Sequence, residues 1–225
     1  YLDYFDLPGN GFTNTSGNER YYDFVEGPVH FFVLNSNDDE PDGITADSRQ
    51  ATWLRSQVAA STSRWNVVVD HHPPYSSDNS HGPTVVLQWP FARWGVDVVM
   101  SGHAHTYERI QRDGITYFVN GLGGAHLYSF GAQPVAGSKV RFADNWGAQR
   151  VRATQDTTEL IELYTRLGQT YEDRLNQVDD AIRAYRVIFD TLEPTHETAI
   201  AALGRLYELK GAWVELNAVH EMDLG

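Results

Sequence analysis

Four short apolar runs, rich in β-branched and aromatic residues, constrain the fold of this chain more than any other feature of its sequence. They span 29–35, 65–70, 96–100 and 115–120, and their length and composition are typical of buried strands. A helical pattern over about 45–61, in which Asp47 and Gln50 can cap the start, separates the first run from the second. A second helical pattern, over 85–95 and interrupted by Pro90, separates the second run from the third. Strands that alternate with helices predict a sheet of α/β type.

The character of the chain changes near residue 153. Residues 1–152 contain 15 of the 19 glycines, whereas the remainder is dense in Leu, Ala, Glu and Arg, a composition that is typical of helices. The 225 residues are enough for one large domain or two small ones. We therefore predict an α/β domain over 1–155, which opens with a surface loop of about 28 residues, and an all-α segment over 156–225.

The second segment contains a weak internal repeat. Asp156 and Glu159 fit a capping box at the start of a helix. The tract 167–171, Leu-Gly-Gln-Thr-Tyr, returns as Leu-Gly-Arg-Leu-Tyr at 203–207, 36 residues later. This period resembles the ~34 residues of a tetratricopeptide repeat. A β-hairpin over 160–173 is the alternative, and it would move the boundary to about Asn176.

Composition excludes several classes of protein. The absence of cysteine excludes a disulfide scaffold, thiolate catalysis and an iron–sulfur cluster. A formal net charge of −13 argues against a nucleic-acid partner, because such proteins cluster Lys and Arg. No apolar run approaches the ~20 residues that cross a bilayer.

Histidines follow the second and third apolar runs directly. His71 and His72 follow Asp70, and His103 and His105 follow Ser101 and Gly102. Ligands bind beyond the carboxyl ends of strands in open α/β sheets. In extended backbone the rings of His103 and His105 would point to the same side, so that with His71 they would make a nitrogen-rich metal cluster.

These tracts resemble one family. Residues 71–75 (His-His-Pro-Pro-Tyr), 102–109 (Gly-His-Ala-His-Thr-Tyr-Glu-Arg) and 120–124 (Asn-Gly-Leu-Gly-Gly) are similar to motifs of the calcineurin-like metallophosphoesterases. Together with the opening tract 17–24, they resemble the purple-acid-phosphatase-like branch, over about residues 1–155.

The resemblance implies a four-layer α/β sandwich and a centre of two metal ions (Fe, Zn or Mn) that hydrolyses phosphate esters. It places His71 and His103 on one metal and His105 on the other. It also suggests an extracellular or periplasmic location. Two further histidines are candidate catalytic residues: His72 as a donor beside the metal ligands, and His81 near the substrate phosphate.

The sequence also departs from the family. The family's Gly-Asp, Gly-Asp-x-x-Tyr and Gly-Asn-His motifs, which supply bridging carboxylates and an Asn to the metal centre, do not occur in these 225 residues. With a start at Tyr1 rather than Met, this leads us to expect a partial hydrolase, incomplete or inactive as the chain stands. The alternative is a non-catalytic protein that self-assembles or binds a protein partner through its helical tail.

Overall fold

The structure is a computed structural model that describes the backbone of residues 4–223 and the side chains of residues 4–219. The chain divides into two compact units, Tyr1–Ala153 and Thr154–Gly225, which are described separately. No helix in the described part of the chain has the length and apolar character that a membrane span requires.

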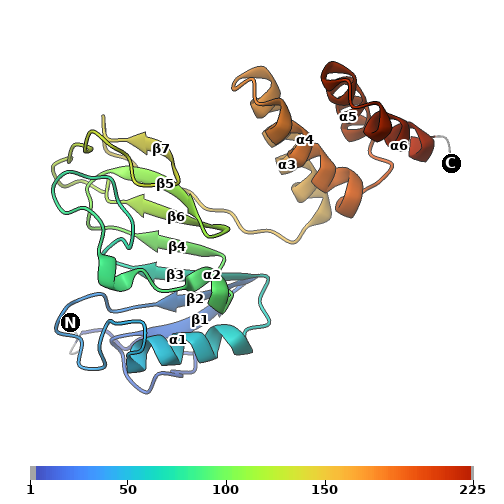
Figure 1. The fold of residues 1–225 in the computed structure, drawn as a ribbon. Coiled ribbons are helices and arrows are strands. Elements are labelled where there is room, and N and C mark those ends of the chain that lie inside the picture. Colours follow the sequence, from blue (N-terminus) through green and yellow to red (C-terminus); the bar gives the residue numbers. More distant parts are fainter. Residues whose placement is uncertain (1–3, 224–225) are drawn as a thin grey trace. The chain divides into compact units, whose positions relative to one another are not determined.

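The first unit is built on one seven-stranded mixed sheet with the strand order β1-β2-β3-β4-β6-β5-β7 (Figure 1). Strands β2, β3, β4 and β6 are parallel to one another, and β1, β5 and β7 join antiparallel. The strand bounds are β1 (Tyr22–Glu26), β2 (Val29–Val33), β3 (Trp65–Asp70), β4 (Val98–Ser101), β5 (Tyr107–Arg112), β6 (Ile115–Asn120) and β7 (Ser138–Phe142). The predicted α/β type of this unit is thus observed as one mixed sheet with helices.

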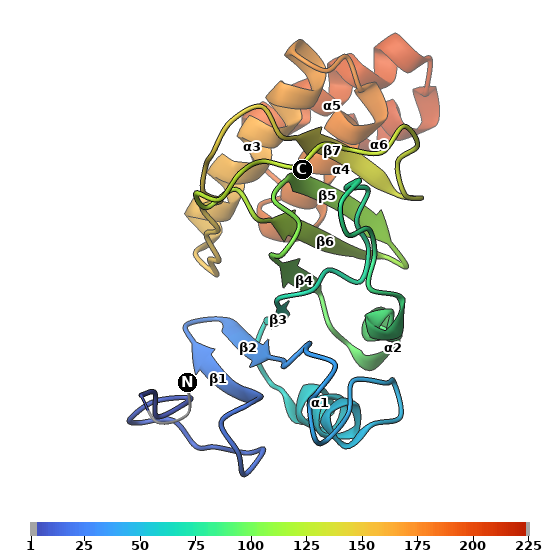
Figure 2. The same ribbon diagram turned by 90° about the vertical axis from the view of Figure 1, so that its left-hand side faces the viewer.

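Both α-helices that the structure describes in the first unit lie on the same side of the sheet. They are α1 (Arg49–Ala60) and the short α2 (Phe91–Trp94), and Figure 2 shows them together beside the sheet. Successive crossovers between neighbouring parallel strands have the same hand, so they return over the same face. Under these helices the pairing register aligns one row of side chains, each at most 2% exposed: Phe32, Val68, Val99, Tyr117 and Ile110.

The opposite face of the sheet is also apolar, but one row of its side chains is only half-buried. The register aligns a second row there, which consists of Tyr22, Val33, Val69, Met100 and Phe118. Strands with apolar residues on both faces read as continuous apolar runs, which is why β2, β3 and β4 are visible in the sequence.

Three local predictions for the first unit were wrong. Residues 22–26 form the edge strand β1 instead of continuing the opening loop. The pattern over 85–95 yields only a 3₁₀ turn (Val85–Leu87) and α2, because Pro90 has no backbone N–H to continue a helix. The cap of α1 is Ser48, whose side chain accepts a hydrogen bond from the Ala51 amide, while the Asp47 carboxylate accepts one from the Thr45 hydroxyl.

The second unit contains four α-helices in its described part: α3 (Thr157–Asp173), α4 (Val178–Val187), α5 (Glu197–Lys210) and α6 (Trp213–Asp223). A π-helical turn (Ile188–Leu192) extends α4. Residues 157–173 form the helix α3, so the hairpin alternative is wrong. At the start of this helix the Asp156 carboxylate accepts a hydrogen bond from the Glu159 amide. The tetratricopeptide assignment stays a prediction.

Candidate metal centre

Strands β3 and β4 deliver histidines to the same edge of the sheet. The last residues of the two strands, Asp70 and Ser101, are register partners. The chain segments that leave the strands are therefore neighbours, and the Gly102 amide donates a hydrogen bond to the carbonyl oxygen of His71 (3.1 Å). Side chains that follow these two strands must lie close together.

Three imidazoles meet at this edge. One ring nitrogen from each of His71, His72 and His103 lies within 4.8 Å of the others. His103 Nδ1 is 3.1 Å from His71 Nε2, and the His72 and His103 ring centroids are 4.4 Å apart. Such a group of nitrogen donors is typical of sites for Zn and other transition metals.

The residue that holds His72 comes from a third segment. Ser36, which follows β2, places its hydroxyl 2.8 Å from His72 Nδ1. The same oxygen accepts hydrogen bonds from the backbone amides of His71 and His72. The serine thus restrains both the backbone and one ring nitrogen of His72, an outer contact of the kind that orients metal ligands. The sequence contains no pattern that marks Ser36.

Burial lowers the pKa values of two of these imidazoles, those of His103 and His71. Burial, together with the neighbouring His72, His81 and His71, lowers the pKa of His103 to about 4. Burial also lowers the pKa of His71, and His72 and His105 add to the shift. A neutral imidazole keeps a lone pair for a cation, so the donors fit a divalent metal.

His105 lies in a different environment from His103. Its Nδ1 is 2.7 Å from the carbonyl oxygen of His126 and donates to it, which leaves Nε2 as the acceptor nitrogen. Its ring stacks on Tyr128 with centroids 4.1 Å apart. The expectation that His103 and His105 share an extended backbone was wrong. β4 ends at Ser101, and His103 adopts the left-handed φ of +56°, which breaks the alternation of a strand. His105 is therefore not a member of the three-histidine group.

His81 lies beside the group on a separate loop. Its ring centroid is 4.2 Å from that of His103, and its Nε2 is 3.3 Å from the Tyr128 hydroxyl. The Asp78 carboxylate shapes this loop by accepting the amides of Ser80, His81 and Gly82. Tyr128 therefore touches both His81 and His105, although sequence reasoning did not identify it.

A buried carboxylate anchors the loop that carries His81. Glu108 on β5 is 0% exposed and accepts hydrogen bonds from the Ser77 amide (2.7 Å), the Ser77 hydroxyl (2.5 Å) and the Ser138 hydroxyl (2.6 Å). These bonds tie the Ser77 loop and the first residue of β7 to β5, so Glu108 has a structural role near the site.

Comparisons with known proteins support the resemblance of the motifs. Residues 1–107 match the family model of the calcineurin-like phosphoesterases. Purple acid phosphatase 18 of Arabidopsis thaliana is 33% identical over 105 residues, which cover 43% of this chain and 23% of that protein. A purple acid phosphatase of Glycine max is 37% identical over 112 residues, or 45% of this chain and 23% of that protein. The chain thus spans about a quarter of the length of these relatives.

A solved structure shows the same fold. The purple acid phosphatase from yellow lupin (Lupinus luteus) seeds superposes with a TM-score of 0.51 at 20% identity, over 60% of this chain and 28% of that one. Residues 1–107 are therefore similar to the calcineurin-like phosphoesterases, and the first part of the chain is similar in sequence to purple acid phosphatases.

Proposed function

We propose that the first unit is the metal-binding part of a phosphoric ester hydrolase and that His71, His72 and His103 hold its metal ion. The observation that supports this most directly is the approach of three imidazole nitrogens to within 4.8 Å at the carboxyl ends of β3 and β4. The family match and the purple acid phosphatase relatives supply the reaction class. His72 takes the place of His105 in this ligand set. We propose His105 as a ligand of a second metal site that binds more weakly.

The donor set favours one metal ion over two. Neutral imidazoles suit Zn and Fe, whereas Mn prefers carboxylate oxygens. The three-residue group contains no carboxylate, so it offers no negative charge to balance two neighbouring cations. A bound cation would supply Lewis-acid activation of water and phosphate. We therefore expect these 225 residues to bind one metal ion and to hydrolyse phosphate esters slowly or not at all.

The surrounding side chains would orient the reactants. Ser36 fixes one nitrogen of His72. The ring centroid of His81 is 4.2 Å from that of His103, and His81 Nε2 lies 3.3 Å from the Tyr128 hydroxyl. A phosphate at the metal would meet the His81 imidazole, which can donate a hydrogen bond to a phosphate oxygen or a proton to the leaving group. We retain His81 as the proposed catalytic histidine on this basis, and we assign His72 to the metal instead of the catalytic role expected from the sequence.

The test is metal analysis of the purified full chain after dialysis against Zn²⁺. We expect about one equivalent of Zn, because a three-histidine site takes a single ion. His103→Ala and His71→Ala should each remove most of it. His196→Asn is the matched control, since His196 caps α5 far along the chain and Asn is also a good cap. Equal Zn content in all four proteins would exclude the proposed site.

Hydrolysis is measured in the same preparations with p-nitrophenyl phosphate. We expect any activity to disappear with the metal in the His103→Ala variant, and a His81→Ala variant to keep its Zn while losing activity. Activity that survives the loss of Zn would contradict the proposed reaction even if the metal site is real. We also propose an extracellular or periplasmic setting from the family resemblance.

A further inference from the structure

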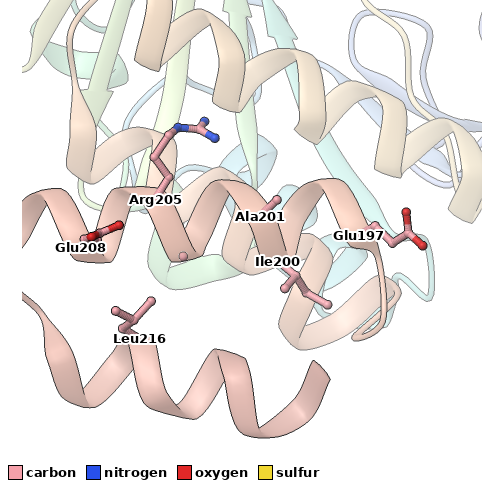
Figure 3. Close-up of a pocket in the computed structure, with 7 residues that line it drawn as sticks. Glu197, Ile200, Ala201, Arg205, Glu208 and Leu216 are labelled. Atoms are coloured by element: carbon pink, nitrogen blue, oxygen red, sulfur yellow. The ribbon is translucent and has the colours of Figure 1, made fainter. Parts of the chain in front are cut away.

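Two adjoining grooves lie on the second unit, with helix α5 between them. The larger, ≈ 700 Å³, runs between α5 and α6 and has Ile200 and Leu216 in its lining (Figure 3). The smaller, ≈ 490 Å³, extends from α5 to α3 and includes Tyr185 of α4. Glu197, Ala201 and Arg205 line both. We call this combined surface the α5 groove.

The charge of the α5 groove is strongly negative. Its lining contains four carboxylates, from Glu172, Asp173, Glu197 and Glu208, and one cation, from Arg205. Arg205 points away from α6 in Figure 3, and its guanidinium Nη2 donates to Glu172 Oε1 at 2.6 Å. No ion pair within the described residues compensates the other three carboxylates.

Several acids elsewhere in the unit are neutralised. Lys210, Arg183 and Arg186 pair with Asp179, Asp180 and Asp190, respectively. The available cations of this unit therefore compensate the outer surface more than the groove, which keeps a local excess of negative charge. An excess of this kind attracts and orients a positively charged partner.

Between its two acidic positions, α5 lines the groove with two small residues and with Ile200 and Arg205. Ala201 and Gly204 lie between Glu197 and Glu208, and their small size lets a peptide backbone approach the helix. Glu197 and Glu208 are eleven positions apart, or about 16 Å along a helix. An extended chain covers that distance in about five residues.

We propose that the α5 groove binds an extended cationic peptide segment. The segment carries two Lys or Arg residues about five positions apart, which pair with Glu197 and Glu208, and one apolar residue between them, which packs on Ile200 and Leu216. The occupant is a protein partner with this sequence character, and the proposal does not depend on the metal centre.

Binding is tested on the full chain by fluorescence anisotropy with the labelled peptide Lys-Ala-Ala-Leu-Ala-Lys. We expect binding that weakens as salt is raised, and at least about tenfold weaker binding of the peptide with Glu in place of Lys. The double variant Glu197→Gln/Glu208→Gln should weaken binding of the Lys peptide by about 2- to 30-fold, the range for two exposed ion pairs. The charge-matched control is Glu162→Gln/Glu215→Gln, which changes two exposed acids outside the groove.

Three results would overturn the proposal. They are the absence of saturable binding, equal binding of the Lys and Glu peptides, and equal weakening by the two double variants. Light scattering tests whether a second copy of the chain occupies the groove instead. If the wild type forms a dimer that Glu197→Gln/Glu208→Gln dissociates, a second copy of the chain fills the groove and the cationic peptide does not.

Discussion

Gly168 in α3 is predicted to be intolerant of even one methyl group. A Cβ built on it would lie 2.5 Å from Tyr185 Cζ and 2.7 and 2.8 Å from the two Cε atoms of that ring. Tyr185 is 1% exposed in the core of the second unit, so its ring has no free space into which it can move. The contact brings α3 unusually close to α4 at this residue.

The sign of the effect of Gly168→Ala depends on two opposing contributions. Alanine in a helix interior stabilises by about 1 kcal/mol relative to glycine. Overpacking a buried site costs about 1–3 kcal/mol, and three contacts under 3 Å to a rigid ring place this site at the upper end. We therefore expect a net loss of about 2 kcal/mol in the free energy of unfolding of the second unit.

The assay is urea denaturation followed by far-ultraviolet circular dichroism, which reports mainly on the helical unit. Gln169→Ala, an exposed change in the same helix, should shift the free energy of unfolding by less than about 0.5 kcal/mol. In a Tyr185→Leu background, Gly168→Ala should become neutral or stabilising, because the ring atoms are gone. A stabilising effect of Gly168→Ala in the wild type, or the same loss in both backgrounds, would refute the reasoning.

Three further predictions concern the first unit and are tested by chemical denaturation or metal analysis. Gly121→Ala places a Cβ 2.1 Å from a backbone carbonyl of the histidine loop, so we expect a loss of at least about 3 kcal/mol and loss of bound Zn; retention of both would contradict this geometry. Ser48→Ala should cost about 1 kcal/mol as loss of the α1 cap, whereas Asp47→Ala should cost under about 0.5 kcal/mol; the reverse order would restore Asp47 as the cap. Val68→Ala should cost about 2–3 kcal/mol and Val69→Ala about 1 kcal/mol, because only Val68 is fully buried; equal costs would show that another layer covers the second face.

The sequence predicted the central strands well and the edge strands poorly. The runs that became β2, β3, β4 and β6 are apolar on both faces, so they stand out without knowledge of their neighbours. Strand β5, with the sequence Tyr-Glu-Arg-Ile-Gln-Arg, mixes polar and apolar residues. It is a strand because it pairs with β6 and β7, and such pairing involves residues that no local pattern connects.

The histidines of the candidate metal centre were also predicted only in part. Strand-terminal histidines were predicted to meet, and His71 and His103 do so because their strands are register neighbours. The sequence did not reveal that His72 belongs with them, since its position depends on Ser36, 36 residues away. It also did not reveal that His105 turns to His126 and Tyr128.

By itself, then, the sequence determined which segments are buried strands and helices, which chemical groups are available, and the family that the motifs resemble. These properties depend on side-chain type and short-range spacing. Only the tertiary structure decided which imidazoles form a group, which face of the sheet is left half-exposed, and where unpaired carboxylates line a groove. Those outcomes depend on strand register, on the left-handed turn at His103 and on ion pairs between helices, all of which join residues distant in the chain.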